Sequence, residues 1–151
     1  MVSKLRLMNK SKNKKKTISA TVGLVVGVGV AILIQQLVFK TPSFDKAMMQ
    51  AASELNKSCP VMVDQETRLD NAVALPDNIF QYNYTLINLE KDSIDLQIFE
   101  GYMKPMILNN VKTNPDLQAY RDNKVTMAYN YKDKNGVFIT KISITADQYS
   151  K

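Results

Sequence analysis

Four charged residues alternate along the stretch VDQETRLD, which runs from Val63 to Asp70. If this stretch is a β-strand, alternate side chains point to the same face, because strand side chains have a period of two. The strand interpretation then places three carboxylates and a guanidinium in one row, formed by Asp64, Glu66, Arg68 and Asp70. Such a row suggests four kinds of chemistry: a metal site, an acid/base pair, a surface that binds a partner, or an ordinary solvated face.

The spacing of this charged row argues against metal binding and acid/base catalysis. Calcium and magnesium need several oxygen atoms that converge on one point, whereas same-face residues of a straight strand are about 6.6 Å apart. Arg68 also places a positive charge in the middle of the row. Acid/base catalysis needs two carboxyl groups in different environments, and the neighbouring sequence provides no such difference. Two interpretations remain open: a solvated face, and a surface that binds a protein partner.

The composition of the chain removes several classes of catalytic and metal site. The 151 residues contain no histidine and one cysteine, Cys59. Catalytic arrangements that depend on histidine are therefore excluded, as are zinc sites built from cysteine and histidine. A single cysteine cannot form an intramolecular disulfide, so the fold must depend on its hydrophobic core. We expect no enzymatic activity, no metal and no cofactor.

Positive charge is concentrated at the N-terminus. The first 40 residues carry eight Lys and Arg and no acidic residue, whereas residues 41–151 carry 12 Lys and Arg against 14 Asp and Glu. The formal net charge of +6 therefore arises from the N-terminal segment alone. The remainder is mildly acidic and lacks the basic surface that nucleic-acid binding requires, so we expect no nucleic-acid partner.

An uncharged, apolar segment follows the basic residues. It runs from residue 18 to residue 39 and reads ISATVGLVVGVGVAILIQQLVF. A helix of this length spans about 33 Å, close to the ~30 Å hydrocarbon core of a bilayer. We therefore predict a transmembrane helix, and the preceding positive charges indicate a cytoplasmic N-terminus. A cleaved signal peptide is the alternative, but its apolar run is usually shorter and ends at a small-residue cleavage site.

This topology divides the chain into a basic cytoplasmic tail (1–17), a transmembrane helix (18–39) and an extracytoplasmic domain (40–151). The predicted location is the inner, cytoplasmic membrane, crossed once, with the domain outside the cytoplasm. Gly23 and Gly27 have the GxxxG spacing that lets two membrane helices approach closely. These glycines are a candidate helix–helix contact for a homodimer formed through the transmembrane helix.

Periodicity predicts an α+β fold for the extracytoplasmic domain. Helical patterns cover residues 43–57, 92–113 and 114–121, and strand patterns cover residues 61–69, 79–87, 125–131 and 138–144. Gly101 and Pro105 should kink or break the second helix. The order is helix, two strands, helices and two strands, and the strands should form one antiparallel sheet of about four strands with helices on one face.

Two of these strands contain the triplet YNY, at residues 82–84 and 129–131. The repetition suggests a duplicated helix–strand–strand unit. Tyrosine rings in a cleft between sheet and helices could bind a small molecule or a cell-wall fragment, which gives a second functional hypothesis for Tyr82, Tyr84, Tyr129 and Tyr131. Packing of the rings in the core, with hydroxyls at its rim, is the alternative role.

The Lys-rich start, the membrane helix, the segment CPVMVDQETRLDNAVALPDNIFQYNYTL and the terminal YNYKDKNG hairpin together resemble a group of proteins. They are small, uncharacterised bacterial proteins with one N-terminal transmembrane helix and an extracytoplasmic α+β domain. The resemblance covers most of residues 50–145 and implies a bacterial source but no activity. Our leading hypothesis is a non-enzymatic protein whose outer domain binds another protein, or helps to assemble an envelope complex, through the charged row.

Overall fold

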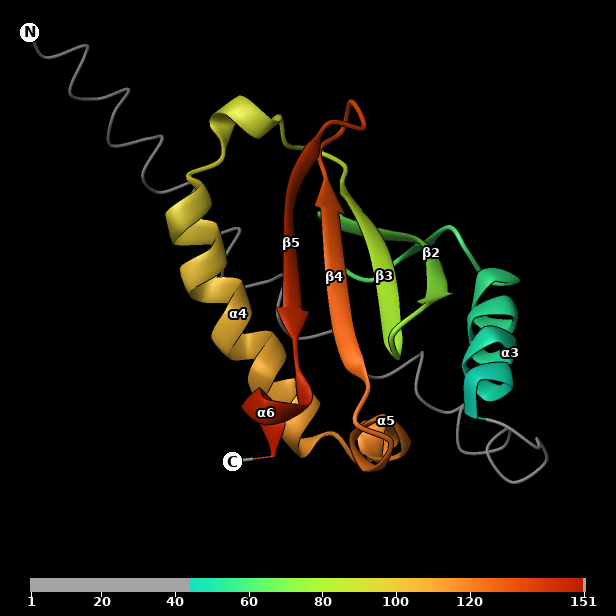
Figure 1. Cartoon of the computed structure of the whole chain (residues 1–151). Coiled ribbons are helices and arrows are strands. Elements are labelled where there is room, and N and C mark those ends of the chain that lie inside the picture. The colour runs from blue at the N-terminus through green and yellow to red at the C-terminus, as the bar shows by residue number, and fades with distance from the viewer. Residues whose placement is uncertain (1–43, 151) are drawn as a thin grey trace, which may run out of the picture.

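The computed structural model describes residues 44–150, which form an α+β domain with one mixed sheet (Figure 1). The strands lie in the order β1-β2-β3-β4-β5. The elements are α3 (Phe44–Asn56), β1 (Val61–Met62), β2 (Thr67–Leu75), β3 (Ile79–Leu86), η1 (Lys91–Ser93), α4 (Leu96–Thr113), η2 (Pro115–Leu117), α5 (Gln118–Asp122), β4 (Thr126–Lys132), β5 (Phe138–Ile144) and α6 (Ala146–Tyr149). The predicted α+β class is confirmed, but the sheet has five strands rather than four.

The prediction of a purely antiparallel sheet is wrong. The pairs β2–β3 and β4–β5 are antiparallel, whereas β3 and β4 lie parallel at the centre of the sheet. The chain leaves the end of β3, descends through α4 and α5, and enters β4 at the end where β3 began (Figure 1). A helical crossover of this kind brings the next strand back in the same direction.

The predicted break in the second helix is also absent. α4 continues from Leu96 to Thr113 through Gly101 and Pro105. A proline inside a helix leaves one carbonyl without its usual N–H donor. That carbonyl belongs to Gly101, which is exposed, so water can hydrate it.

The two YNY triplets lie side by side in the parallel pair. Tyr82 pairs with Tyr129, and Tyr84 pairs with Tyr131. β3 is the second strand of its hairpin, however, and β4 is the first strand of the next one. The triplets therefore occupy non-equivalent positions, which contradicts the hypothesis of a duplicated helix–strand–strand unit.

The strand tyrosines pack in the hydrophobic core between the sheet and the helices. Tyr82, Tyr84, Tyr129 and Tyr131 are each at most 3% exposed. Rings stack across the parallel pair with centroid distances of 5.4 and 5.3 Å, and Phe99 of α4 contacts Tyr131 edge-on at 5.3 Å. The rings are covered, so the hypothesis of a ligand cleft lined by these tyrosines is wrong.

Asn56, at the end of α3, closes part of the free edge of β2. β1 pairs only with Arg68 and Leu69 of β2. Farther along, Asn56 Nδ2 donates to the carbonyl oxygen of Ala72 at 2.8 Å, and the backbone N–H of Ala72 donates to Asn56 Oδ1 at 2.7 Å. The amide side chain thus satisfies the backbone groups that a neighbouring strand would otherwise pair with.

Among residues 44–150, the structure contains no helix that is long and apolar enough to cross a bilayer. The predicted transmembrane helix at residues 18–39 lies outside the described residues, as do the basic tail and the contact between Gly23 and Gly27. These features remain predictions from the sequence.

Candidate interaction surface

The structure separates the four residues of the predicted charged row. β2 begins at Thr67, so Asp64 and Glu66 lie in the connection from β1 rather than in a strand. Asp64 Oδ1 accepts hydrogen bonds from the backbone N–H groups of Glu66 and Thr67, both at 2.7 Å. An aspartate side chain that binds the backbone in this way favours a turn over a strand. The prediction of one continuous row is therefore wrong for its first two residues.

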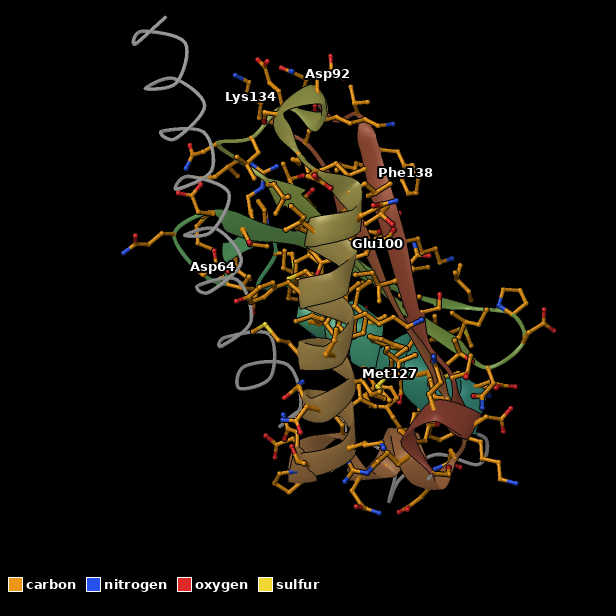
Figure 2. All side chains as sticks on the ribbon, turned by 90° about the vertical axis from the view of Figure 1, so that its left-hand side faces the viewer. Asp64, Asp92, Glu100, Met127, Lys134 and Phe138 are labelled. Carbon is orange, nitrogen blue, oxygen red and sulfur yellow. The ribbon has the colours of Figure 1, made fainter. Side chains whose placement is uncertain are left out.

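The side chain of Asp64 points into the domain. Its Oδ2 atom is buried, and neither this atom nor the buried hydroxyl of Tyr131 has a hydrogen-bond partner among the described residues. Burial raises the pKa of Tyr131, and the negative charge of Asp64 raises it further. Glu66 contacts the connection between β3 and η1, because its Oε2 accepts from Asn88 Nδ2 at 2.9 Å. Figure 2 places Asp64 on the flank of α4 away from Phe138.

Arg68 and Asp70 remain together on β2. Arg68 Nε lies 2.6 Å from Asp70 Oδ1, and Asp70 Oδ2 accepts from the hydroxyl of Thr85 on β3, also at 2.6 Å. The register of β2 against β3 shifts between Leu69 and Asn71, so Asp70 is the additional residue of a β-bulge. Because of the bulge, the side chains of Arg68 and Asp70 both lie beside Thr85 of β3.

These two residues belong to the face of the sheet opposite the core. The residues that alternate with the core tyrosines along the strands point away from the helices. On the side of the sheet seen in Figure 1, no helix of residues 44–150 crosses β3, β4 and β5. We call this side the open face. Strand register arranges it in three rows: Arg68, Thr85, Lys132 and Phe138; Asn71, Asn83, Asn130 and Lys141; and Val73, Gln81, Ala128 and Ser143.

Four carboxamides on three strands form a hydrogen-bonded amide ladder across the open face. Asn83 Nδ2 donates to Asn71 Oδ1 at 2.6 Å. Asn83 Oδ1 accepts from Gln81 Nε2 at 2.8 Å and from Asn130 Nδ2 at 3.1 Å. Sequence reasoning missed this ladder, although the asparagine at the centre of each YNY triplet was its signal.

The open face carries positive charge on an otherwise acidic domain. Residues 44–150 contain 11 Lys and Arg against 14 Asp and Glu. Within the strands of the open face, however, the one acidic residue, Asp70, is paired with Arg68. Glu66 lies beside them in the β1–β2 connection, where its carboxylate accepts from Asn88. Lys132 and Lys141 are exposed and form no ion pair within the described part of the chain. Two unneutralised lysines therefore remain on this side of the sheet.

Metal ligands and the Cys59 thiol are two kinds of group that could give the described residues reactivity. No cluster of three His, Cys, Asp or Glu residues in the range 44–150 could hold a metal ion. Burial raises the pKa of the Cys59 thiol, and the charge of Asp70 raises it further. A thiol with a raised pKa stays protonated at neutral pH and is a poor nucleophile.

Comparison with known proteins assigns the domain to a family. A family profile described as a domain of unknown function, DUF8479, matches residues 43–138. The chain belongs to this family. A search of curated proteins finds no match to this DUF8479 chain.

Solved structures share the fold of this DUF8479 domain at low sequence identity. A Pseudomonas aeruginosa protein inferred to be secreted, PA3611, aligns with a TM-score of 0.60 and 9% identity, covering 70% of this chain and 91% of its own. The type II secretion system pilotin EpsS from Vibrio vulnificus aligns at 0.54 and 9%, covering 70% and 90%. The pilotin AspS of the corresponding Vibrio cholerae system aligns at 0.50 and 11%, covering 69% and 90%.

Proposed function

We propose that this chain is a single-pass protein of the bacterial inner membrane whose outer domain binds a protein partner without catalysing a reaction. In this proposal, residues 18–39 hold the domain outside the cytoplasm, and the domain helps to assemble a complex of the cell envelope. An anchor would raise the effective concentration of the domain for partners in the same membrane.

The observation that carries this proposal is the open face. It presents ordered polar side chains and two exposed lysines on β4 and β5, with no helix of the described residues across it. The fold that the domain shares with a protein inferred to be secreted and with two type II secretion pilotins supports an envelope or secretion-assembly role. The absence of histidine from the whole chain supports a non-enzymatic role.

Arg68 and Asp70 are the members of the charged row that we retain as partner-binding candidates, because they lie on the open face. Glu66 lies nearby in the β1–β2 connection, and Asp64 would act by holding that connection in its turn. Replacement of Arg68 and Asp70 by Ala should therefore weaken partner binding more than a matched pair elsewhere. Glu54 and Lys57 on the helical side form such a pair, since their side chains are bridged at 2.6 Å.

Site-specific photocrosslinking in cells tests the proposal. A photoreactive residue at Val73, which is 37% exposed on the open face, should form an adduct with one envelope protein. The same residue at Ser53, exposed on α3, should not form that adduct. The adduct should weaken in R68A/D70A and persist in E54A/K57A. A protease added outside the inner membrane should cleave a C-terminal tag. Equal adducts from both positions, or a protected tag, would contradict the proposal.

A further inference from the structure

We propose that the open face binds an acidic segment of its protein partner, with Lys132 and Lys141 contacting carboxylates and the amide ladder contacting polar groups between them. This inference rests on the proposed protein-binding function and names the chemistry of the partner. It adds a basic site on β4 and β5 to the Arg68 and Asp70 pair retained from the charged row.

Charge complementarity is the first argument for an acidic partner. Asp70 is already neutralised by Arg68 and also accepts from Thr85. Lys132 and Lys141 then give the open face a surplus of positive charge, although acidic residues outnumber basic ones over residues 44–150. A local potential opposite in sign to the rest of a domain orients a charged partner towards one face.

The spacing of the two lysines is the second argument. Lys141 pairs directly with Asn130, two residues before Lys132, so the lysines are diagonal neighbours on adjacent antiparallel strands. Such neighbours lie about 7–8 Å apart in a regular ladder, and here the β4–β5 register shifts between Tyr131 and Lys132. Same-face residues of an extended chain are about 6.6 Å apart, so acidic side chains at alternate positions of an extended segment match the two lysines.

The amide ladder is the third argument, because it fixes polar groups before a partner arrives. Asn83 is held by three hydrogen bonds, to Asn71, Gln81 and Asn130. Side chains that are already ordered lose less entropy when they bind. Phe138 ends the row that contains Lys132 and is 51% exposed, and aromatic side chains are enriched in protein interfaces.

This arrangement favours a protein segment over a membrane surface. Attraction to anionic lipid depends on basic side chains near the surface and requires no ordered carboxamides. The open face instead places four linked carboxamides beside its two free lysines. Carboxamides donate to and accept from peptide groups and polar side chains, which an extended polypeptide presents along its whole length.

Binding of a defined acidic peptide to the full chain in detergent micelles tests this inference. The probe is a synthetic peptide in which Glu alternates with Ser, and backbone amide NMR shifts report where it binds. We expect shifts at β4 and β5, and weaker binding at higher salt. The variant K132E/K141E should weaken binding about tenfold, equivalent to about 1.4 kcal/mol. K132R/K141R should bind as the unmodified chain does.

The matched control is K46E/K104E, which changes net charge equally but replaces exposed lysines of α3 and α4. It should leave the dissociation constant within about twofold, since both sites lie in the helical layer. Three results would overturn the inference: an equal loss in this control, phosphatidylglycerol vesicles binding in place of the peptide, or self-association that depends on Lys132 and Lys141. If K132E/K141E leaves the Val73 crosslink intact, the acidic-segment inference fails while the protein-binding function stands.

Discussion

The pair of hydrogen bonds between Asn56 and Ala72 should contribute measurably to stability, because it connects α3 to a strand 16 residues away. Each bond between protein groups contributes about 1 kcal/mol net, and a buried backbone group left unpaired costs about 1–3 kcal/mol. Asn56→Ala should therefore lower the free energy of unfolding by about 2 kcal/mol. For a domain of this size that corresponds to roughly 8 °C in Tm.

Urea unfolding of the full chain in micelles, followed by far-ultraviolet circular dichroism, measures this change. The control is Asn109→Ala on α4, since Asn109 is also an exposed helical asparagine. Asn109 lies inside α4, whereas Asn56 is the last residue of α3, so only the control gains the full difference in helix propensity, at most about 0.7 kcal/mol. A larger difference between the variants reports the contacts with Ala72. If the two variants unfold within about 0.5 kcal/mol of each other, Asn56 does not secure the edge of β2.

Three further predictions follow from the core and from the β4–β5 turn. Phe99→Ala removes a ring that contacts Tyr131 and should cost about 3–4 kcal/mol in the free energy of unfolding, measured by urea; unchanged stability would contradict the assigned packing. Burial raises the pKa values of the core tyrosines, so the folded chain holds these protons more tightly than the unfolded chain. The stabilisation from the buried tyrosines should be fully present below about pH 10 and decrease as pH rises above it. Tyrosinate absorbance and loss of ellipticity should change together; tyrosinate that forms while the fold persists would contradict this. Burial opposes ionisation of Asp133, but backbone donors from Lys91, Val137 and Asn135 and the charge of Lys134 lower its pKa. The stabilisation from Asp133 should be present above about pH 4 and lost as pH falls below it. The Tm of Asp133→Asn should therefore decrease less than the Tm of the unmodified chain as pH falls across that range.

The sequence predicted well those features that depend on local alternation. Period-two patterns identified β3, β4 and β5, and the rings of Tyr82 and Tyr129 lie on the buried side as the core interpretation required. Alternation carries no information about strand direction, so the parallel pairing of β3 and β4 could not be read from it. β1 has two residues, which is too short for a periodic pattern.

The candidate surface was less predictable because its contacts join distant residues. Asp64 fits a strand pattern, yet its carboxylate binds the backbone two and three residues later and turns the chain. The ladder joins Asn83 to Asn130, 47 residues away, and exists only when the two YNY triplets align in parallel. A single sequence shows the two asparagines but gives no register between them.

The central parallel pair also determines how the domain can assemble. The β2–β3 and β4–β5 hairpins close over short connections, whereas β3 meets β4 only after a crossover that contains α4 and α5. Loop-closure entropy grows with chain separation, and distant pairing slows folding. We therefore expect each hairpin to form early and the parallel contact to form last. A chain cut within the crossover would yield one hairpin on each fragment, and their affinity for each other would report the strength of the tyrosine-stacked parallel contact.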